Sequence, residues 1–413
     1  MKAVILAAGE GRRMRPLTEA RPKAMLTVAG KPIAERLICE AAAAGIRDFV
    51  FVVGYLGERI RDYFGDGGRW GVHITYCVQD NATGTAAALG LAGQAVAGPF
   101  LVANGDSIVL RADIARLMSL GESQIGVKEV EYPERYGAVE FAGDRVARIY
   151  EKSLNPPSTL ANAGIYLFTQ KIFEAIAATS LSVRGEYELT AAINSFINNG
   201  GMMGYCRVDS WREISYQWDL LSVGEELMTD LDGLSEGVIQ SGVTISGGVR
   251  VGADSIIRTG TYISGPVIIG NGCDIGPNCY IRASSVIGDG CRIGAGVEIK
   301  NSVVMSGTKI PHLSYIGDSV IGENCNLGAG TNVANMRLDG GEVEVRGVPT
   351  GRRKLGVVMG DGVRTGINAC LNPGTVIGGG AWIGPGAVAC GDIAPGARVF
   401  APAKPQAKRE SIE

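Results

Sequence analysis

The chain has 413 residues, of which 46% are hydrophobic and 20% are charged, and its formal net charge at pH 7 is −3. This charge, without a long basic run, argues against a protein that binds nucleic acid or a membrane surface. No apolar run approaches the roughly 18 residues of a membrane-spanning helix, and the first residues do not resemble a secretory leader. We therefore expect a cytoplasmic protein.

The first 210 residues alternate between strand-like and helix-like segments. KAVILAA (residues 2–8) is a continuous apolar run, which is typical of a parallel strand covered on both faces. Further strands are expected at 48–53, 72–79 and 99–106, with helices at 32–46, 56–64 and 85–96. This alternation predicts a doubly wound α/β domain over residues 1–228, with ligands at the carboxyl ends of the strands.

A connecting helix is expected at residues 213–231 and a linker at 229–240, after which a repeat begins. Glycine is concentrated there, since 34 of the 61 glycines lie from Ser241 onward. The phase of the repeat slips at residues 309–317 and breaks at 336–354 before it returns at Met359. Before the slip, every sixth residue is aliphatic: Ile245, Val251, Ile257, Ile263, Ile269, Ile275, Ile281, Ile287, Ile293, Ile299 and Met305.

A period of six fits neither an α-helix nor a simple strand. It fits a coil with flat sides, in which one aliphatic residue per side points inward and glycine or asparagine takes the corners. The pattern resembles the hexapeptide-repeat, left-handed parallel β-helix, which we predict for residues 241–400, followed by a tail at 401–413. The alternative, a sandwich with regular turns, would show alternation at a period of two.

The nine cysteines form no CxxC pair, and the two histidines, His73 and His312, adjoin no cysteine cluster. A structural zinc site is therefore not expected. Several cysteines lie inside the repeat, where a small buried side chain fits. We interpret them as reduced core thiols.

A glycine-rich loop with several cations follows the first strand, in LAAGEGRRMRPLTEARPKAML (residues 6–26). Gly9 and Gly11 would let backbone N–H groups approach phosphate oxygens, and Arg13 and Lys23 would neutralise the phosphate charge. The loop is not a dinucleotide fingerprint, because Met14 replaces the third glycine, and it lacks the GK[ST] of a Walker A loop. The loop alone is weak evidence.

The whole string, with RPLT followed by RPKAML, resembles the sugar-1-phosphate nucleotidylyltransferases. Further matches follow in order, in GTAAAL, NGD, YGAVEF, EKS and NAGIYLF. The resemblance implies nucleotide-binding roles for Gly9, Gly11, Gln79, Gly84 and Thr85, a sugar-phosphate pocket at Gly137, Glu151, Lys152 and Asn162, and metal ligation by Asp106. Glu213 stands where the family has a second Mg²⁺-binding aspartate.

The implied reaction is the attack of a sugar phosphate oxygen on the α-phosphorus of a nucleoside triphosphate, with pyrophosphate leaving. Mg²⁺, Arg13 and Lys23 would stabilise the negative charge that spreads in the transition state. Taken singly, some of these residues have plainer explanations. Asp106 could cap a turn, and Glu151 with Lys152 could be a solvated pair.

The phase slip contains His312, the only histidine of the repeat region. The sequence HLSYIGD (residues 312–318) resembles the acetyltransferase half of bifunctional N-acetylglucosamine-1-phosphate uridylyltransferase/glucosamine-1-phosphate acetyltransferase. In that family the histidine is the general base for attack by the sugar amine on acetyl-CoA, and imidazole suits this task because its pKa is near neutral. The resemblance further implies substrate binding by Arg282, Lys300, Tyr315, Asn326, Asn335 and Lys354.

The chain departs from that family at Met336, which replaces a tyrosine, and in a longer segment at residues 337–353 that resembles archaeal members. The family also implies a homotrimer. We therefore predict a bifunctional enzyme of UDP-N-acetylglucosamine biosynthesis, with Mg²⁺ as cofactor and acetyl-CoA as co-substrate. It would use UTP or dTTP, which the sequence does not rank. One alternative is a monofunctional nucleotidylyltransferase with a structural or regulatory β-helix, and a second is a sensor that binds a nucleotide sugar without turnover.

Overall fold

The computed structural model describes residues 1–121 and 123–401, which divide into two compact units. The amino-terminal unit comprises residues 1–14 and 20–215, and the carboxy-terminal unit comprises residues 15–19 and those from Tyr216 onward. The sequence predicts this boundary after residue 228, but helix α7 (Asp219–Leu227) groups with the second unit. Of the predicted 401–413 tail, residues 402–413 lie outside the described residues.

Within the described residues, a nine-stranded sheet forms the centre of the amino-terminal unit, in the order β5-β4-β1-β6-β11-β8-β12-β10-β9. Its strands are β1 (Lys2–Ala7), β4 (Asp48–Val53), β5 (His73–Val78), β6 (Phe100–Asn104), β8 (Gln124–Glu129), β9 (Gly137–Ala142), β10 (Arg145–Glu151), β11 (Leu160–Phe168) and β12 (Gly204–Arg207). Two-stranded pairs add β2 (Thr27–Val28) with β3 (Lys31–Pro32) and β7 (Ser107–Ile108) with β13 (Arg212–Glu213).

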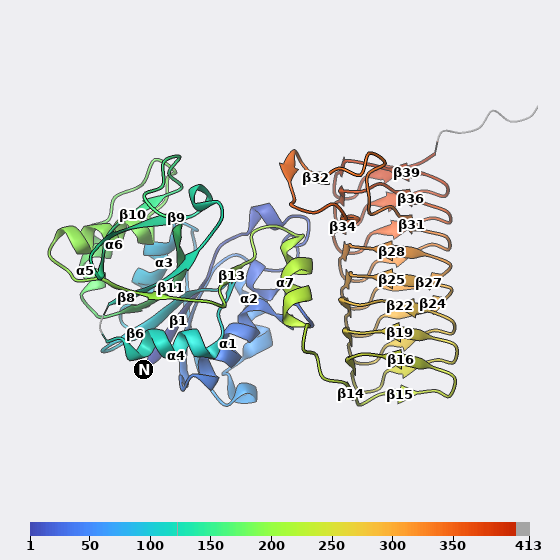
Figure 1. Cartoon of the computed structure of the whole chain (residues 1–413), viewed down its shortest axis with the longest axis horizontal. Coiled ribbons are helices and arrows are strands. Elements are labelled where there is room, and N and C mark those ends of the chain that lie inside the picture. The colour runs from blue at the N-terminus through green and yellow to red at the C-terminus, as the bar shows by residue number, and fades with distance from the viewer. Residues whose placement is uncertain (122, 402–413) are drawn as a thin grey trace, which may run out of the picture. The chain divides into compact units, whose positions relative to one another are not determined.

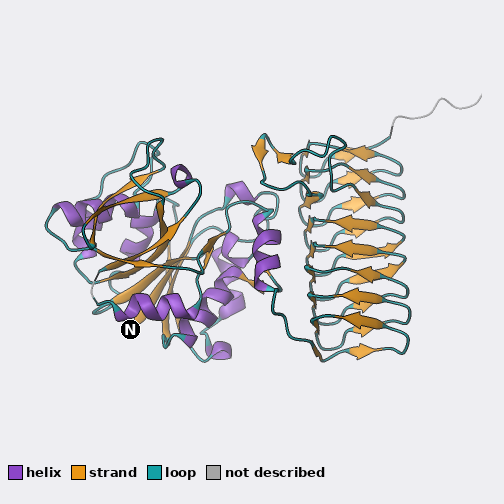
Figure 2. Ribbon diagram, in the orientation of Figure 1, coloured by secondary structure: helices purple, strands orange, loops and turns teal. Residues whose placement is uncertain are grey.

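The helices of this unit cover both faces of the sheet (Figure 2). They are α1 (Ile33–Ala43), α2 (Gly57–Phe64), α3 (Thr85–Leu91), α4 (Arg111–Ser119), α5 (Ile172–Ala177) and α6 (Leu189–Asn198), with 3₁₀ turns η1 (Arg12–Met14), η2 (Lys23–Met25), η3 (Gly68–Trp70) and η4 (Pro133–Arg135). In β1, Ile5 packs into the core under α1, α2 and α4, whereas Val4 packs into the core under α3, α5 and α6. Apolar side chains on both faces explain the unbroken hydrophobic run of this strand.

The structure corrects two details of the sequence prediction. The sheet is mixed, because β11 runs antiparallel to both β6 and β8. The predicted connecting helix begins at Asp219 instead of residue 213, because Glu213 lies in β13 and pairs with Ser107 of β7. None of the helices in the described residues is long and apolar enough to cross a membrane.

The carboxy-terminal unit consists of α7 and three parallel sheets whose short strands alternate along the chain (Figure 1). Sheet I contains β14 (Leu234–Ser235), β17 (Val249–Val251), β20 (Val267–Ile269), β23 (Ser285–Ile287), β26 (Val303–Val304), β29 (Val320–Ile321), β34 (Val357–Met359), β37 (Thr375–Ile377) and β40 (Asp392–Ile393). Sheet II contains β15 (Val238–Ile239), β18 (Ile256–Ile257), β21 (Asp274–Ile275), β24 (Arg292–Ala295), β27 (Lys309–His312), β30 (Asn326–Leu327), β35 (Arg364–Thr365), β38 (Trp382–Ile383) and β41 (Arg398–Val399). Sheet III contains β16 (Thr244–Ser246), β19 (Tyr262–Ser264), β22 (Tyr280–Ile281), β25 (Glu298–Lys300), β28 (Tyr315–Gly317), β31 (Asn332–Val333), β36 (Cys370–Leu371) and β39 (Val388–Ala389).

Each strand of these sheets pairs with the third sheet strand after it, with the separate β32–β33 hairpin left out of the count, so that the chain winds in coils, as a parallel β-helix does. Ile275 pairs with Ile293, and Ile293 with Ile310, so that one aliphatic column lines the interior. Cys273, Cys279, Cys291 and Cys325 join this core, and all nine cysteines are free. The interpretation of the repeat cysteines as reduced core thiols agrees with the burial of these four, whereas Cys370 and Cys390 are exposed.

The position of the phase slip differs from the sequence prediction. Val304, and not Met305, belongs to the interior column, so the first slip lies between Ile299 and Val304. A second slip separates Ile316 from Ile321. Partner strands in this region are 17 residues apart, as for Glu298 and Tyr315, compared with 18 for Tyr280 and Glu298.

The burial of the interior column predicts how a substitution within it changes stability. Replacing Ile293, which is fully buried, with alanine should lower the free energy of unfolding of the coils by about 2–5 kcal/mol, because a cavity remains where the coils cannot collapse. Denaturant unfolding followed by circular dichroism would measure this change. Arg292→Ala, an exposed neighbour, serves as the control, and equal losses from the two substitutions would contradict the assignment of Ile293 to the core.

Candidate active sites

The first candidate site lies where β6 ends in the amino-terminal unit. Asp106 follows β6, and the Nζ atom of Lys23 lies 2.6 Å from its Oδ2 atom. Glu213 is held beside this pair, because β13 pairs with β7 and the N–H of Ile214 donates to the carbonyl of Asp106 at 3.1 Å. The structure thus brings together three residues that are far apart in the sequence, at the sheet edge where ligands bind in such folds.

The two carboxylates influence each other electrostatically. Burial raises the pKa of Glu213, and the negative charge of Asp106 raises it further, whereas the charges of Lys23 and Arg13 act in the opposite direction. Two carboxylates that lie close together are a favourable place for a divalent cation, whose charge offsets their mutual repulsion.

The donor set fits Mg²⁺, which commonly binds through one or two carboxylates, with phosphate oxygens and water completing its shell. The described residues contain no group of three or more histidine, cysteine, aspartate or glutamate side chains arranged to hold a metal ion. The pairing of β13 with β7 places Glu213 opposite Ser107, the neighbour of Asp106, and the charge of Asp106 raises the pKa of Glu213.

The glycine-rich loop lies directly after β1. Gly11 has a φ of +66°, and its carbonyl accepts the N–H of Met14 at 2.9 Å, which forms the turn carrying the exposed Arg13. Gly9 differs, because a Cβ atom there would meet nothing within 4 Å. Local packing does not require glycine at this position, and the close approach of a phosphate group stays a prediction.

The predicted base-reading residues lie around the turn before α3. Gln79 is 8% exposed, and its Nε2 atom donates to the carbonyl of Gly84 at 3.3 Å, which orients the amide. Gly84 has a structural requirement, because its φ is +118° and a Cβ atom would lie 2.4 Å from the carbonyl oxygen of Tyr187. The hydroxyl of Thr85 accepts the N–H of Leu189 at 3.0 Å, so this side chain is engaged in holding the start of α6.

The residues predicted to bind the sugar phosphate lie on β9, β10 and β11 or directly after β10. Gly137 pairs with Glu151, and a Cβ atom at residue 137 would lie 3.1 Å from the Oε2 atom of that carboxylate. Asn162 donates to the hydroxyl of Tyr166 at 2.7 Å, and Lys152 is exposed. The sequence prediction missed Arg184, whose guanidinium lies 3.2 Å from Glu151.

The second candidate site lies on the coils. His312 ends β27, next to Ala295 of the preceding coil, and its side chain is exposed on the outside of the coils. Leu313 follows with a φ of +45°, so the chain turns immediately after the histidine. The imidazole is therefore accessible to a ligand, as a general base must be.

Three of the predicted substrate residues lie around the carboxylate of Asp318, for which the sequence predicts no role. Asp318 lies 2.9 Å from the Nζ atom of Lys300 and also accepts a hydrogen bond from Asn335. Asn335 in turn donates to the hydroxyl of Tyr315 at 3.2 Å. Burial raises the pKa of Tyr315, and the charge of Asp318 raises it further.

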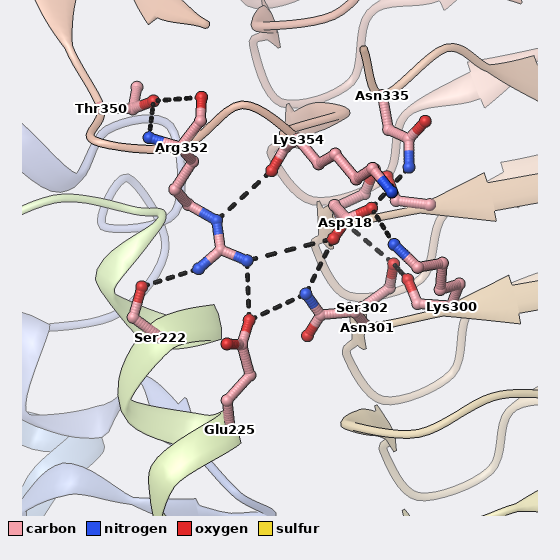
Figure 3. A network of polar contacts seen from close by, with 12 residues as sticks. Ser222, Glu225, Lys300, Asn301, Ser302, Asp318, Asn335, Thr350, Arg352 and Lys354 are labelled. Carbon is pink, nitrogen blue, oxygen red and sulfur yellow. Dashed lines mark hydrogen bonds and ion pairs between the residues drawn. The ribbon is translucent and has the colours of Figure 1, made fainter. Parts of the chain in front are cut away.

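Of the remaining predicted residues, Arg282 and Asn326 lie outside this cluster, whereas the carbonyl of Lys354 accepts a hydrogen bond from Arg352 at 3.4 Å, beside Asp318 (Figure 3). Arg282 pairs with Glu298 at 2.8 Å, one coil before Tyr315. Asn326 is exposed on β30, and Lys354 is exposed next to Met336, with which it forms a β-bridge. The structure therefore does not bring Asn326 and Lys354 into polar contact with His312 or Lys300 in this chain.

The longer segment at residues 337–353 contains a hairpin of β32 (Glu344–Val345) and β33 (Val348–Pro349) and contributes Arg352 to this region. The guanidinium of Arg352 lies 2.7 Å from Glu225 and donates to Ser222 at 2.7 Å, and both of these residues lie on α7 (Figure 3). Neither Arg352 nor Glu225 carried a sequence signal, because their contact joins residues far apart in the chain.

The comparisons with known proteins first define the class. Residues 2–229 match the family model described as nucleotidyl transferase, and residues 263–349 match the model described as the GMPPB C-terminal domain. A solved structure from Bacillus anthracis, assigned as a glucose-1-phosphate thymidylyltransferase in complex with a sucrose, is 30% identical with a TM-score of 0.51. The similarity covers 56% of this chain and 96% of that one.

Curated relatives extend the similarity to nearly the whole chain. The Methanocaldococcus jannaschii protein named bifunctional protein GlmU is 39% identical over 389 residues, which are 93% of each chain. A Sulfurisphaera tokodaii protein named bifunctional sugar-1-phosphate nucleotidylyltransferase/acetyltransferase is 39% identical over 408 residues, covering 95% of this chain and 98% of that one. The chain belongs to the family of these bifunctional proteins.

Proposed function

We propose that the amino-terminal unit transfers UMP or dTMP from UTP or dTTP to a sugar-1-phosphate, such as N-acetylglucosamine-1-phosphate or glucose-1-phosphate, and releases pyrophosphate. The arrangement of Lys23, Asp106 and Glu213 at the strand ends supports this assignment. Gln79, with its amide held by the carbonyl of Gly84, would read the pyrimidine.

In this reaction the sugar phosphate oxygen forms a bond to the α-phosphorus while the bond from that phosphorus to pyrophosphate breaks. Lys23 and Arg13 would stabilise the negative charge on the phosphoryl oxygens, and the backbone at Gly9 and Gly11 would hold the triphosphate. A bound Mg²⁺ would neutralise phosphate charge and orient the leaving group. Asp106 and Glu213 would hold that ion, and no residue of the chain needs to act as a nucleophile.

Chelation provides a test of the metal assignment. Excess EDTA should abolish pyrophosphate release, because the phosphoryl charge is then no longer neutralised, and it should leave CoA release unchanged. Restoring MgCl₂ in excess over EDTA should restore pyrophosphate release in the same sample. Equal loss of the two activities on chelation would contradict the placement of the metal in one site.

We propose for the carboxy-terminal unit the acetylation of glucosamine-1-phosphate by acetyl-CoA, with galactosamine-1-phosphate as a further candidate substrate. The sugar amine would attack the thioester carbonyl, His312 would accept the proton, and the CoA thiolate would leave. Arg282, Lys300, Tyr315, Asn326, Asn335 and Lys354 would bind the sugar phosphate. The outward imidazole carries this proposal and favours it over a solely structural role for the coils.

The two reactions together would place the protein in UDP-N-acetylglucosamine biosynthesis, in the cytoplasm. The coils would form a left-handed β-helix and assemble as a homotrimer. Within a trimer, a neighbouring subunit would supply lid and CoA contacts to the acetyltransferase site. A panel of four nucleoside triphosphates against glucose-, glucosamine- and N-acetylglucosamine-1-phosphate, with and without acetyl-CoA, would test both activities and rank UTP against dTTP.

A further inference from the structure

Asp318 is the most buried charged residue of the second site, since its side chain is 3% exposed. Its Oδ2 atom lies 2.9 Å from the Nζ atom of Lys300 and accepts a hydrogen bond from the Nδ2 atom of Asn335. Its Oδ1 atom accepts from Asn301 at 2.8 Å and lies 4.0 Å from Arg352 (Figure 3). Each oxygen of this carboxylate therefore faces donors on two sides.

The charges around Asp318 balance. Lys300 and Arg352 each bring a positive charge, and Glu225 completes the set by binding both Arg352 and Asn301. A buried carboxylate is stable in its ionised form only when it is paired and hydrogen-bonded. The network meets that requirement, so the carboxylate is a fixed negative centre around which the neighbouring donors are arranged.

This arrangement fixes the orientation of the Asn335 amide. One proton of Nδ2 goes to Asp318 and the other is directed to the hydroxyl of Tyr315. A flipped amide would place its carbonyl oxygen against a carboxylate, which is repulsive. The Oδ1 atom of Asn335 therefore points away from Asp318, and the Tyr315 hydroxyl, which accepts from Asn335, directs its own proton elsewhere.

The carboxylate of Asp318 also restricts the conformational freedom of the Lys300 side chain. A free lysine side chain has four rotatable bonds, and ordering it on binding opposes affinity. Asp318 takes one of the three ammonium donors, which leaves two for a ligand, and the Lys300 side chain remains 21% exposed. Lys300 is thus held in place while it can still contact an anion.

We propose that Asp318 is a positioning residue for the acetyltransferase site, which pre-orders the ammonium of Lys300 and the amide of Asn335 to receive the phosphorylated amino sugar. This inference rests on the proposed acetylation of glucosamine-1-phosphate. Asp318 itself contacts neither substrate, because its oxygens are occupied by Lys300, Asn335 and Asn301.

Asp318→Asn tests this role, because the amide has the shape of the carboxylate but lacks its charge. We expect the KM for glucosamine-1-phosphate to rise about 10- to 100-fold, by analogy with the range found when a group that orients a metal-ligating side chain is removed. The KM for acetyl-CoA and the rate of pyrophosphate release should each change less than about twofold. A stability defect alone would not separate the two KM values in this way.

Two further variants provide a control and a test of whether Asp318 acts through Lys300. Asp274→Asn removes the carboxylate of another ion pair on the coils, with Arg258, and should leave both KM values unchanged. In a Lys300→Ala background, Asp318→Asn should raise the KM for glucosamine-1-phosphate by a factor at least threefold smaller than in the wild type, because Lys300 no longer needs positioning. An undiminished factor in that background would show that Asp318 does not act through Lys300.

The outcomes separate this inference from the function on which it rests. A wild-type protein that does not acetylate glucosamine-1-phosphate would refute the proposed function. Acetylation by the wild type, with an unchanged sugar KM in Asp318→Asn, would overturn the positioning role alone. If Asp318→Asn does not fold, Asp318→Glu keeps the charge but moves it by one methylene, and an unchanged sugar KM in that variant would likewise overturn the proposal.

Discussion

Replacing His312 with alanine is expected to abolish CoA release from acetyl-CoA and to leave pyrophosphate release intact. Loss of a general base costs about 10²- to 10⁴-fold in rate, because the proton of the attacking amine then has no positioned acceptor. The side chain is exposed at the end of β27, so its removal leaves no cavity in the core. Measuring free thiol from CoA and pyrophosphate in parallel on one preparation would give both rates.

The chain offers a matched control for this substitution. His73 is the other histidine, and it is exposed on β5 in the amino-terminal unit. His73→Ala should retain both activities. If a folded His312→Ala protein lost both activities, or lost neither, the assignment of the imidazole to acetyl transfer would be wrong.

Replacing Asp106 with alanine should have the opposite effect, with pyrophosphate release reduced about 10²- to 10³-fold or more and CoA release unchanged. The substitution removes a proposed metal ligand and also deprives Lys23 of its partner at 2.6 Å. Assays over a range of MgCl₂ concentrations would show whether added metal restores pyrophosphate release. If Asp106 is a metal ligand, we expect a partial recovery at high MgCl₂.

A control for the aspartate substitution is Asp144, whose side chain is 96% exposed. Asp144→Ala should not alter either rate. Retention of full pyrophosphate release in Asp106→Ala at limiting MgCl₂ would remove Asp106 from the proposed site.

The sequence predicted the architecture well where a local pattern is repeated many times. The six-residue period predicted the interior column of aliphatic side chains, because each coil has to bury one aliphatic residue per side. The run KAVILAA likewise predicted β1. The prediction was wrong at Met305 and at residue 213, because a one-residue shortening of a corner and the pairing of β13 with β7 are set by distant neighbours.

The candidate sites followed from the sequence less completely. Lys23 and Asp106, predicted from separate motifs, do meet in the structure. Asp318 lies within HLSYIGD, but no sequence pattern predicts its role, since that role depends on contacts with Lys300 and Asn335 that span 17 or 18 residues. Arg352 meets α7 across more than 120 residues, and no spacing rule indicates such a contact.

Two corners of the coils are one residue shorter than the rest, between Ile299 and Val304 and between Ile316 and Ile321. This affects whether these coils can be exchanged for coils of another solenoid. Solenoids ordinarily absorb length changes at their bends, which makes their repeats easy to exchange. Here Asn301 and Asp318 each occupy a tight bend with positive φ, and the successive strands around them are 17 residues apart. Restoring the missing residue at either bend would make the repeat more regular and would also move the carboxylate off the lysine, so these coils are exchangeable only as one block.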